Sequence, residues 1–211
     1  MPKAFSLYFE IIVLLGLPLY FTSASDTLLA ARPWLLAIGG LYCAAILVHS
    51  RATFTDIGLT LGHLQSSLTS LILPSLTIIL LVIILLAASS PPERLWWIGT
   101  DPLSIPSLSV RLVYYIFGSA PVQELIFRGY LTYRLRSVFA NLSLIKLLSI
   151  GVFTLAHLPF KSPVMLLVAL FMGTIYFSNY RRFGNLLAVS ASHALVGACL
   201  IWLRNYYLPY T

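Results

Sequence analysis

The feature that most constrains this chain is the length of its apolar runs. Residues 70–88, "SLILPSLTIILLVIILLAA", hold no charged side chain at any position. A helix that crosses a bilayer core requires about 20 mostly apolar residues. Similar runs occupy most of the 211-residue sequence, of which 59% is hydrophobic and only 9% is charged, less polar surface than a soluble domain needs. The sequence therefore predicts an all-α fold, a polytopic transmembrane helical bundle.

The apolar runs also predict the number and order of the spans. Seven spans are expected, and an eighth is left open; they cover residues 5–23, 34–49, 70–88, 109–131, 144–160, 163–179 and 186–204, the fourth continuing as a helix to about residue 137. Within one integral membrane domain, residues 1–106 would form N-terminal helices with an amphipathic surface connection over 50–69, and residues 107–204 a helical core.

The basic residues set the expected orientation, because cytoplasmic loops are enriched in Lys and Arg. One side would carry the larger group, namely Lys3, Arg51, Arg134, Arg136, Lys146, Arg181 and Arg182, and the other Arg32, Arg94, Lys161 and Arg204. We therefore expect a cytoplasmic N-terminus and an integral protein of the lipid bilayer, with a bacterial inner membrane favoured. The net charge of +7 does not indicate a nucleic-acid partner, since the basic residues lie at span ends without interleaved aromatic residues.

One carboxylate, Glu124, lies deep within an expected span. Such a group is costly in lipid and faces a protein interior or a water-filled cavity. Arg128 follows four residues later, so both side chains share one helix face. Taken alone, this pair fits a structural ion pair as well as a functional site. Glu10 lies near the start of the first span and is expected to reach the surface.

Two histidines, His157 and His193, lie within the fifth and seventh expected spans. At about 1.5 Å of rise per residue, they and Glu124 lie at similar depth, so a common site nearer the cytoplasmic side is expected. A carboxylate and two imidazoles suit water activation, with Glu124 as general base. The same groups bind zinc, but the sequence has no HExxH motif and no complete ligand set. Chemistry without a cofactor is favoured, and zinc stays open.

Four motifs together resemble a known family. They are "QELIFRG" at 123–129, "FTLAH" at 153–157, "FMGTIYFS" at 171–178 and "HALVG" at 193–197. In this order and spacing the chain resembles the CPBP family of intramembrane endopeptidases, which includes type II CAAX prenyl proteases and the Abi proteins. The resemblance covers about residues 107–200. It implies hydrolysis of a membrane-embedded or lipid-anchored peptide or protein by a glutamic-type or a metal-dependent protease.

Two positions depart from the family pattern. The family's first motif is EExxxR, and its first glutamate, usually taken as the catalytic base, is here Gln123, which cannot act as a base. The last motif is HxxxN or HxxxD, and its final residue is here Gly197, which removes the oxyanion donor that the resemblance implies at this position. Adjacent helix residues point about 100° apart, so Glu124 would take over the base role only on a rotated helix, which Pro121 would permit.

Two serines near the last motif are candidates to replace the lost donor. Ser190, in preference to Ser192, would replace it, because it lies one turn before the last motif's histidine. Tyr114, Tyr115 and Tyr130 are positioned to line a substrate path, but simple packing is the preferred interpretation for aromatic residues in spans.

Three functions remain open. The favoured one is an intramembrane endopeptidase that uses Glu124, His157 and His193, with Arg128 positioning Glu124. The loss of the usual glutamate at Gln123 supports a second, a catalytically inactive relative that acts as a membrane scaffold. The third is a small proton-coupled transporter, since intramembrane Glu and His serve as proton relays; no inverted repeat supports it.

Overall fold

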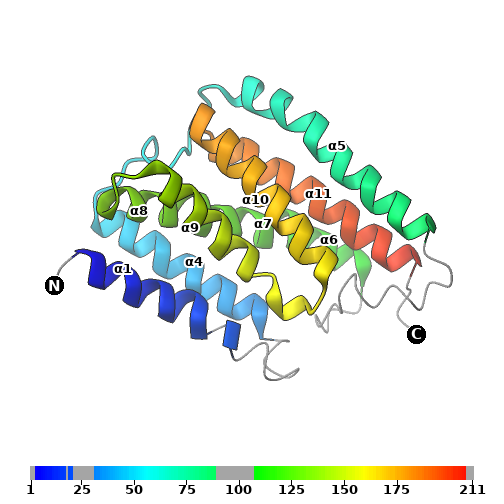
Figure 1. Ribbon diagram of the computed structural model, residues 1–211, viewed down its shortest axis with the longest axis horizontal. Helices are drawn as coiled ribbons and strands as arrows, with labels where there is room; N and C mark the ends of the chain where they lie inside the picture. Colours follow the sequence, from blue (N-terminus) through cyan, green and yellow to red (C-terminus); the bar gives the residue numbers. More distant parts are fainter. Residues whose placement is uncertain (1–2, 18, 21–30, 89–106, 208–211) are drawn as a thin grey trace.

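The computed structural model describes residues 3–17, 19–20, 31–88 and 107–207. Over these residues the chain forms helices and turns, with no strand. The helices lie side by side in one tilted bundle, and α1 and α5 form its opposite edges (Figure 1). The predicted all-α helical bundle is confirmed.

The elements follow the expected order with some changes at their ends. They are α1 (Lys3–Ile11), η1 (Ile12–Gly16), α4 (Arg32–His49), α5 (Leu64–Ala88), α6 (Leu108–Tyr114), η3 (Tyr115–Ser119), α7 (Ala120–Glu124), η4 (Leu125–Leu131), α8 (Thr132–Val138), α9 (Leu142–Leu155), η5 (Leu158–Phe160), α10 (Pro163–Phe183) and α11 (Leu186–Tyr207).

Among the described residues, five helices are long and apolar enough to cross a membrane. They cover Arg32–His49, Leu64–Ala88, Leu142–Phe160, Pro163–Phe183 and Leu186–Tyr206, and they correspond to the second, third, fifth, sixth and seventh expected spans. The first expected span is represented by a shorter apolar helix, Ser6–Gly16, and its residues 21–23 lie outside the described part. The fourth expected span is the helical segment 108–138, which ends close to the predicted residue 137.

Segment 108–138 is one continuous helical path that alternates between α and π turns. The π turns cover Tyr115–Ser119 and Leu125–Leu131. Such turns are frequent at functional sites because the extra residue per turn changes which side chains face a neighbouring helix. The segment packs against α4, α9 and α11 and so occupies the middle of the bundle. Gln123, Glu124 and Arg128 lie on this central segment.

The surface connection is shorter than expected, because α5 begins at Leu64 rather than at residue 70. Turns over 50–63 precede it and hold the start of α11. The Asn185 side chain donates hydrogen bonds of 2.8 Å to the carbonyl oxygens of Thr60 and Gly62. Gly58 has φ +71°, a conformation that favours glycine. The connection therefore fixes the beginning of the helix that carries His193.

Glu10 does not reach the surface, contrary to the expectation. It is 6% exposed, and its carboxylate forms an ion pair of 2.7 Å with Arg134. The hydroxyl groups of Tyr130 and Ser6 also donate to it. The physical reason is that α1 packs against α8, which brings residues 124 positions apart into contact.

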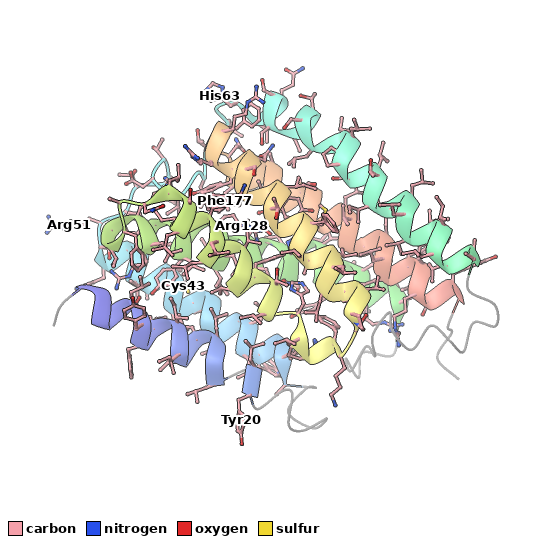
Figure 2. All side chains as sticks on the ribbon, viewed as in Figure 1. Tyr20, Cys43, Arg51, His63, Arg128 and Phe177 are labelled. Carbon is pink, nitrogen blue, oxygen red and sulfur yellow. The ribbon has the colours of Figure 1, made fainter. Side chains whose placement is uncertain are left out.

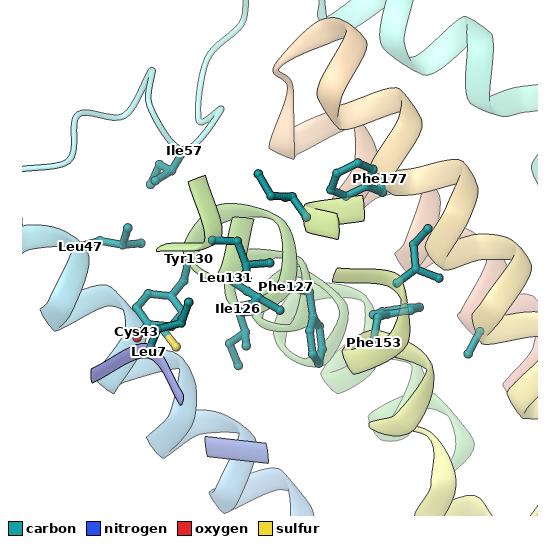
Figure 3. Packing of buried hydrophobic residues seen from close by; sticks show 14 residues of the cluster. Leu7, Cys43, Leu47, Ile57, Ile126, Phe127, Tyr130, Leu131, Phe153 and Phe177 are labelled. Atoms are coloured by element: carbon teal, nitrogen blue, oxygen red, sulfur yellow. The ribbon is translucent and has the colours of Figure 1, made fainter. Parts of the chain in front are cut away.

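The main apolar core joins α1, α4, η4, α9 and α10 (Figure 3). The rings of Phe127 and Phe153 meet edge to face in it, with centroids 5.2 Å apart. Cys43 is a buried free cysteine of the same core, as expected for a small packed side chain. The core surrounds the central segment and fixes the direction in which its polar residues point.

Candidate active site

A buried ion pair lies at the centre of the bundle. Glu124 and Arg128 are both fully buried, and Nη1 of Arg128 lies 3.0 Å from Oε1 of Glu124. Nη2 of Arg128 donates to the carbonyl oxygen of Gly173 at 3.3 Å, and the guanidinium lies 4.0 Å from the ring centroid of Phe153. Figure 2 shows Arg128 midway between the two ends of the helices. The ion pair is thus held by α9 and α10 as well as by its own helix.

His193 completes this arrangement from α11. Its Nδ1 lies 2.7 Å from Oε1 of Glu124. Because an ionised carboxylate only accepts hydrogen bonds, Nδ1 carries the proton, and a neutral ring then keeps its lone pair on Nε2. His193 is 6% exposed and forms part of a cavity wall. The carboxylate therefore orients the imidazole, and Nε2 is the nitrogen that remains for chemistry.

His157 lies just after the end of α9 and is oriented in the same way. Its Nδ1 lies 2.9 Å from the carbonyl oxygen of Phe153, so it donates there and Nε2 keeps the lone pair. The ring of Phe153 contacts both histidines, with centroid distances of 4.9 Å to His157 and 5.7 Å to His193. The structure thus brings Glu124, His157 and His193 together, as their similar depth predicted.

The two histidines line a cavity of about 300 Å³. Gln123 lines it as well, whereas the fully buried Glu124 is absent from the described residues of its wall. Nε2 of Gln123 donates to Oγ of Ser119 at 2.9 Å. The helix is therefore not rotated to present Glu124 to the cavity, and Gln123 occupies the place that faces it.

Most of the cavity wall is apolar. Contributions come from the central segment and from α4, α10 and α11, including Leu36, Gly39, Tyr114, Tyr115, Ile126, Phe127, Met165, Val168, Met172, Tyr176, Val196 and Leu200. Ligand sites of this kind combine a largely apolar wall with a few polar groups that fix orientation. The polar side chains of the wall include the two histidines, Gln123, Ser119 and the hydroxyl groups of the tyrosines. The cavity thus combines a large apolar wall with a few polar side chains.

The cavity extends toward one end of the bundle. Arg32, Arg111 and Arg204 belong to its wall, and Arg32 and Arg204 are the residues expected on the non-cytoplasmic side. In Figure 2, Arg51 and His63 mark the other end of the bundle. Part of the cavity wall thus lies at the end of the bundle away from Arg51 and His63. The cytoplasmic N-terminus and a site nearer the cytoplasmic side stay predictions.

The serines expected to replace the missing donor do not reach the cavity. Neither Ser190 nor Ser192 is among the described residues of its wall. Oγ of Ser192 lies 2.9 Å from Oγ of Ser75 on α5, so this serine joins two helices. Tyr115, by contrast, lies on the cavity wall with its ring centroid 6.0 Å from that of His193. The sequence favoured simple packing for Tyr115. The signal that indicates its place on the cavity wall is Gly197, the glycine that faces it.

The side chains do not fit a complete zinc site. Within residues 3–17, 19–20, 31–88 and 107–207, no group of three or more His, Cys, Asp or Glu side chains is arranged to hold a metal ion. The two Nε2 atoms are two candidate donors, but Oε1 of Glu124 already accepts from Arg128 and His193. A tetrahedral zinc site requires three or four protein ligands. The described side chains therefore supply fewer ligands than a zinc site requires, and the mechanism below uses no metal.

Part of the chain is similar to a known protein family. Residues 105–199 match the family model described as type II CAAX prenyl endopeptidase Rce1-like. No curated protein and no solved structure matches the chain at a significant level. The matched range includes Gln123, Glu124, Arg128, His157 and His193, and it confirms the family resemblance drawn from the motifs.

Proposed function

Because residues 105–199 match the type II CAAX prenyl endopeptidase Rce1-like family, we propose that the protein is an intramembrane endopeptidase. Its substrate would be a membrane-embedded or lipid-anchored protein or peptide. The observation that carries the proposal is the 2.7 Å hydrogen bond between Glu124 and His193, because it directs Nε2 of His193 away from the carboxylate on a cavity wall. The apolar lining of that cavity supports a substrate that arrives from the lipid.

In the proposed mechanism His193 is the general base. A water molecule loses a proton to Nε2 of His193 while its oxygen attacks the carbonyl carbon of the scissile bond. The C–N bond then breaks, and the protonated imidazole returns the proton to the leaving amine. Glu124 stabilises the imidazolium and holds its orientation, and Arg128 holds Glu124. This division differs from a base role for Glu124 itself, since its carboxylate is fully buried.

The remaining polar groups have supporting roles in this scheme. Nε2 of His157 accepts a hydrogen bond from the second proton of the water and so fixes its direction. The amide of Gln123 binds the water or the substrate backbone, but it cannot take a proton. Both residues belong to the cavity wall, which favours contact with whatever occupies it.

A second candidate function rests on Gln123. In the family that the chain resembles, this position usually holds a glutamate that is taken as the catalytic base, whereas here an amide lines the cavity. A protein that kept the cavity but lost the base would bind a membrane peptide without cleaving it. The buried Glu124–Arg128 pair would then serve stability alone.

The test compares the termini of membrane proteins by mass spectrometry in native cells that carry wild type, His193→Ala or Glu124→Gln. His49→Ala is the matched control, because His49 is an exposed histidine at the end of α4, outside the cavity wall. We expect a cleaved terminus in wild type and control that disappears in His193→Ala and falls at least about 100-fold in Glu124→Gln.

The outcomes separate the candidates. A terminus that persists in His193→Ala would remove His193 as the base. If no terminus differs although all four proteins accumulate equally, the protease proposal fails and the binding function is preferred. Gln123→Glu serves as a further variant: a gain in cleavage would indicate that a cavity-facing carboxylate still finds the family's geometry here.

A further inference from the structure

The glycine of the last motif faces a tyrosine from another helix. A Cβ atom built on Gly197 would lie 2.1 Å from the hydroxyl oxygen and 2.3 Å from Cζ of Tyr115. Real Cβ contacts essentially never fall below 3.0 Å. Any side chain at position 197 is therefore incompatible with Tyr115 as it lies. The space that the family's asparagine would occupy is filled here by the end of a phenol ring.

The position of Tyr115 relative to the site is favourable for chemistry. Its ring meets that of His193 edge to face at a centroid distance of 6.0 Å, and both belong to the cavity wall. Tyr115 is the first residue of the π-helical segment Tyr115–Ser119, where the chain departs from α geometry. Within the described part of the chain its hydroxyl has no hydrogen-bond partner, so the proton it donates is available to a molecule in the cavity.

We propose that Tyr115 is a further catalytic residue, whose hydroxyl donates a hydrogen bond to the carbonyl oxygen of the scissile peptide bond. The proposal rests on the proposed endopeptidase function. When water attacks the carbonyl carbon and His193 takes its proton, the π electrons of the C=O bond move to the oxygen. Tyr115 stabilises this oxyanion without transferring its own proton. The C=O bond re-forms as the C–N bond breaks, and the amine takes the proton from His193.

The alternative is that Tyr115 only fills the space beside Gly197. Tyr115→Phe separates the two, because it keeps the ring and removes the hydroxyl. The assay uses the purified protein in nanodiscs and a quenched fluorescent peptide that spans the cleaved bond found in the terminus comparison. An oxyanion donor acts mainly in the transition state, so we expect kcat to fall about 100-fold, with KM changed less than about threefold. An unchanged kcat would overturn the proposal.

A relocation experiment gives a second measurement. In Tyr115→Ala/Gly197→Asn the ring is removed and the amide of the family's usual residue is returned. We expect this double variant to be at least about tenfold more active than Tyr115→Ala alone, because one donor replaces the other. Equal activity of the two variants, with both proteins folded, would contradict the proposal.

The failure of this inference is distinguishable from failure of the proposed function. If wild type cleaves nothing, both are overturned. If wild type cleaves, His193→Ala does not and Tyr115→Phe cleaves normally, only the role of Tyr115 is lost. The placement itself has a readout without activity: Gly197→Ala should lower the thermal unfolding temperature when Tyr115 is present, and should lower it much less in the Tyr115→Ala background.

Discussion

Replacing Arg128 by methionine tests whether the central ion pair holds the bundle together. Arg128→Met keeps a long apolar side chain but removes the positive charge from a fully buried position. The carboxylate of Glu124 would then remain buried and keep its hydrogen bond to His193 alone, and the carbonyl oxygen of Gly173 would lose its hydrogen bond from the guanidinium. Breaking one side of a buried ion pair costs about 3–5 kcal/mol.

The magnitude should exceed that of an ordinary core substitution, because three contacts are lost together. These are the 3.0 Å ion pair with Glu124, the 3.3 Å bond to Gly173 and the stacking over Phe153 at 4.0 Å. A loss of about 3–5 kcal/mol corresponds to a change in the unfolding equilibrium of roughly 100- to 5,000-fold. The assay is reversible unfolding in mixed micelles with increasing SDS, followed by circular dichroism. Arg136→Met, an exposed arginine on α8, is the matched control and should change stability by less than about 0.5 kcal/mol.

A double variant separates the uncompensated charge from the loss of packing. Glu124→Leu/Arg128→Met removes both charges, so we expect it to be more stable than Arg128→Met by about 2 kcal/mol or more. A loss below about 1 kcal/mol in Arg128→Met would refute the reasoning, since the charge would then not be confined to a dry interior. Equal stability of the single and the double variants would show that packing, rather than charge, carries the effect.

The remaining predictions concern the contacts that position the site. Gly58→Ala should destabilise the protein by at least about 1 kcal/mol, because Gly58 has φ +71° and a Cβ there would lie 2.7 Å from a backbone oxygen. Gly151→Ala, whose Cβ would meet nothing within 4 Å, is its control and should be neutral or slightly stabilising in the same thermal melt. Glu10→Gln should cost about 2 kcal/mol, since the 2.7 Å ion pair with Arg134 is lost. A Glu10→Gln protein that unfolds at the same temperature as wild type, or at a higher one, would contradict this prediction.

The identity of the central polar residues was predictable from the sequence. Glu124, His157 and His193 stand out because a buried ionisable group in an apolar chain requires a partner. Equal depth along three helices then predicted that they meet, and the 2.7 Å contact between Glu124 and His193 agrees. The all-α fold followed from the length of the apolar runs alone. Both inferences use local composition and helix rise, which do not depend on how the helices pack.

The direction in which each side chain points was not predictable in the same way. Whether Gln123 or Glu124 faces the cavity depends on the rotation of the central segment, and two π turns change that rotation relative to an ideal α-helix. Glu10 was misplaced for a related reason, since its partner Arg134 lies on a helix 124 residues away. The contact of Tyr115 with position 197 likewise joins helices that are distant in sequence. Such contacts arise from tertiary packing and leave no local pattern.

The neighbouring residues Gln123 and Glu124 have different surroundings although they lie within one turn of helix. Glu124 is fully buried and contacts Arg128 on its own helical segment and His193 on α11, so its loss would disturb the packing of these two helices. Gln123 faces the cavity, and its side chain donates one hydrogen bond to Ser119. A substitution at position 123 therefore changes the polar surface of the cavity with little loss of stability, whereas a substitution at position 124 changes the stability of the fold as well as the site. Glutamine can therefore stand at position 123 while the buried contacts of Glu124 with Arg128 and His193 are kept.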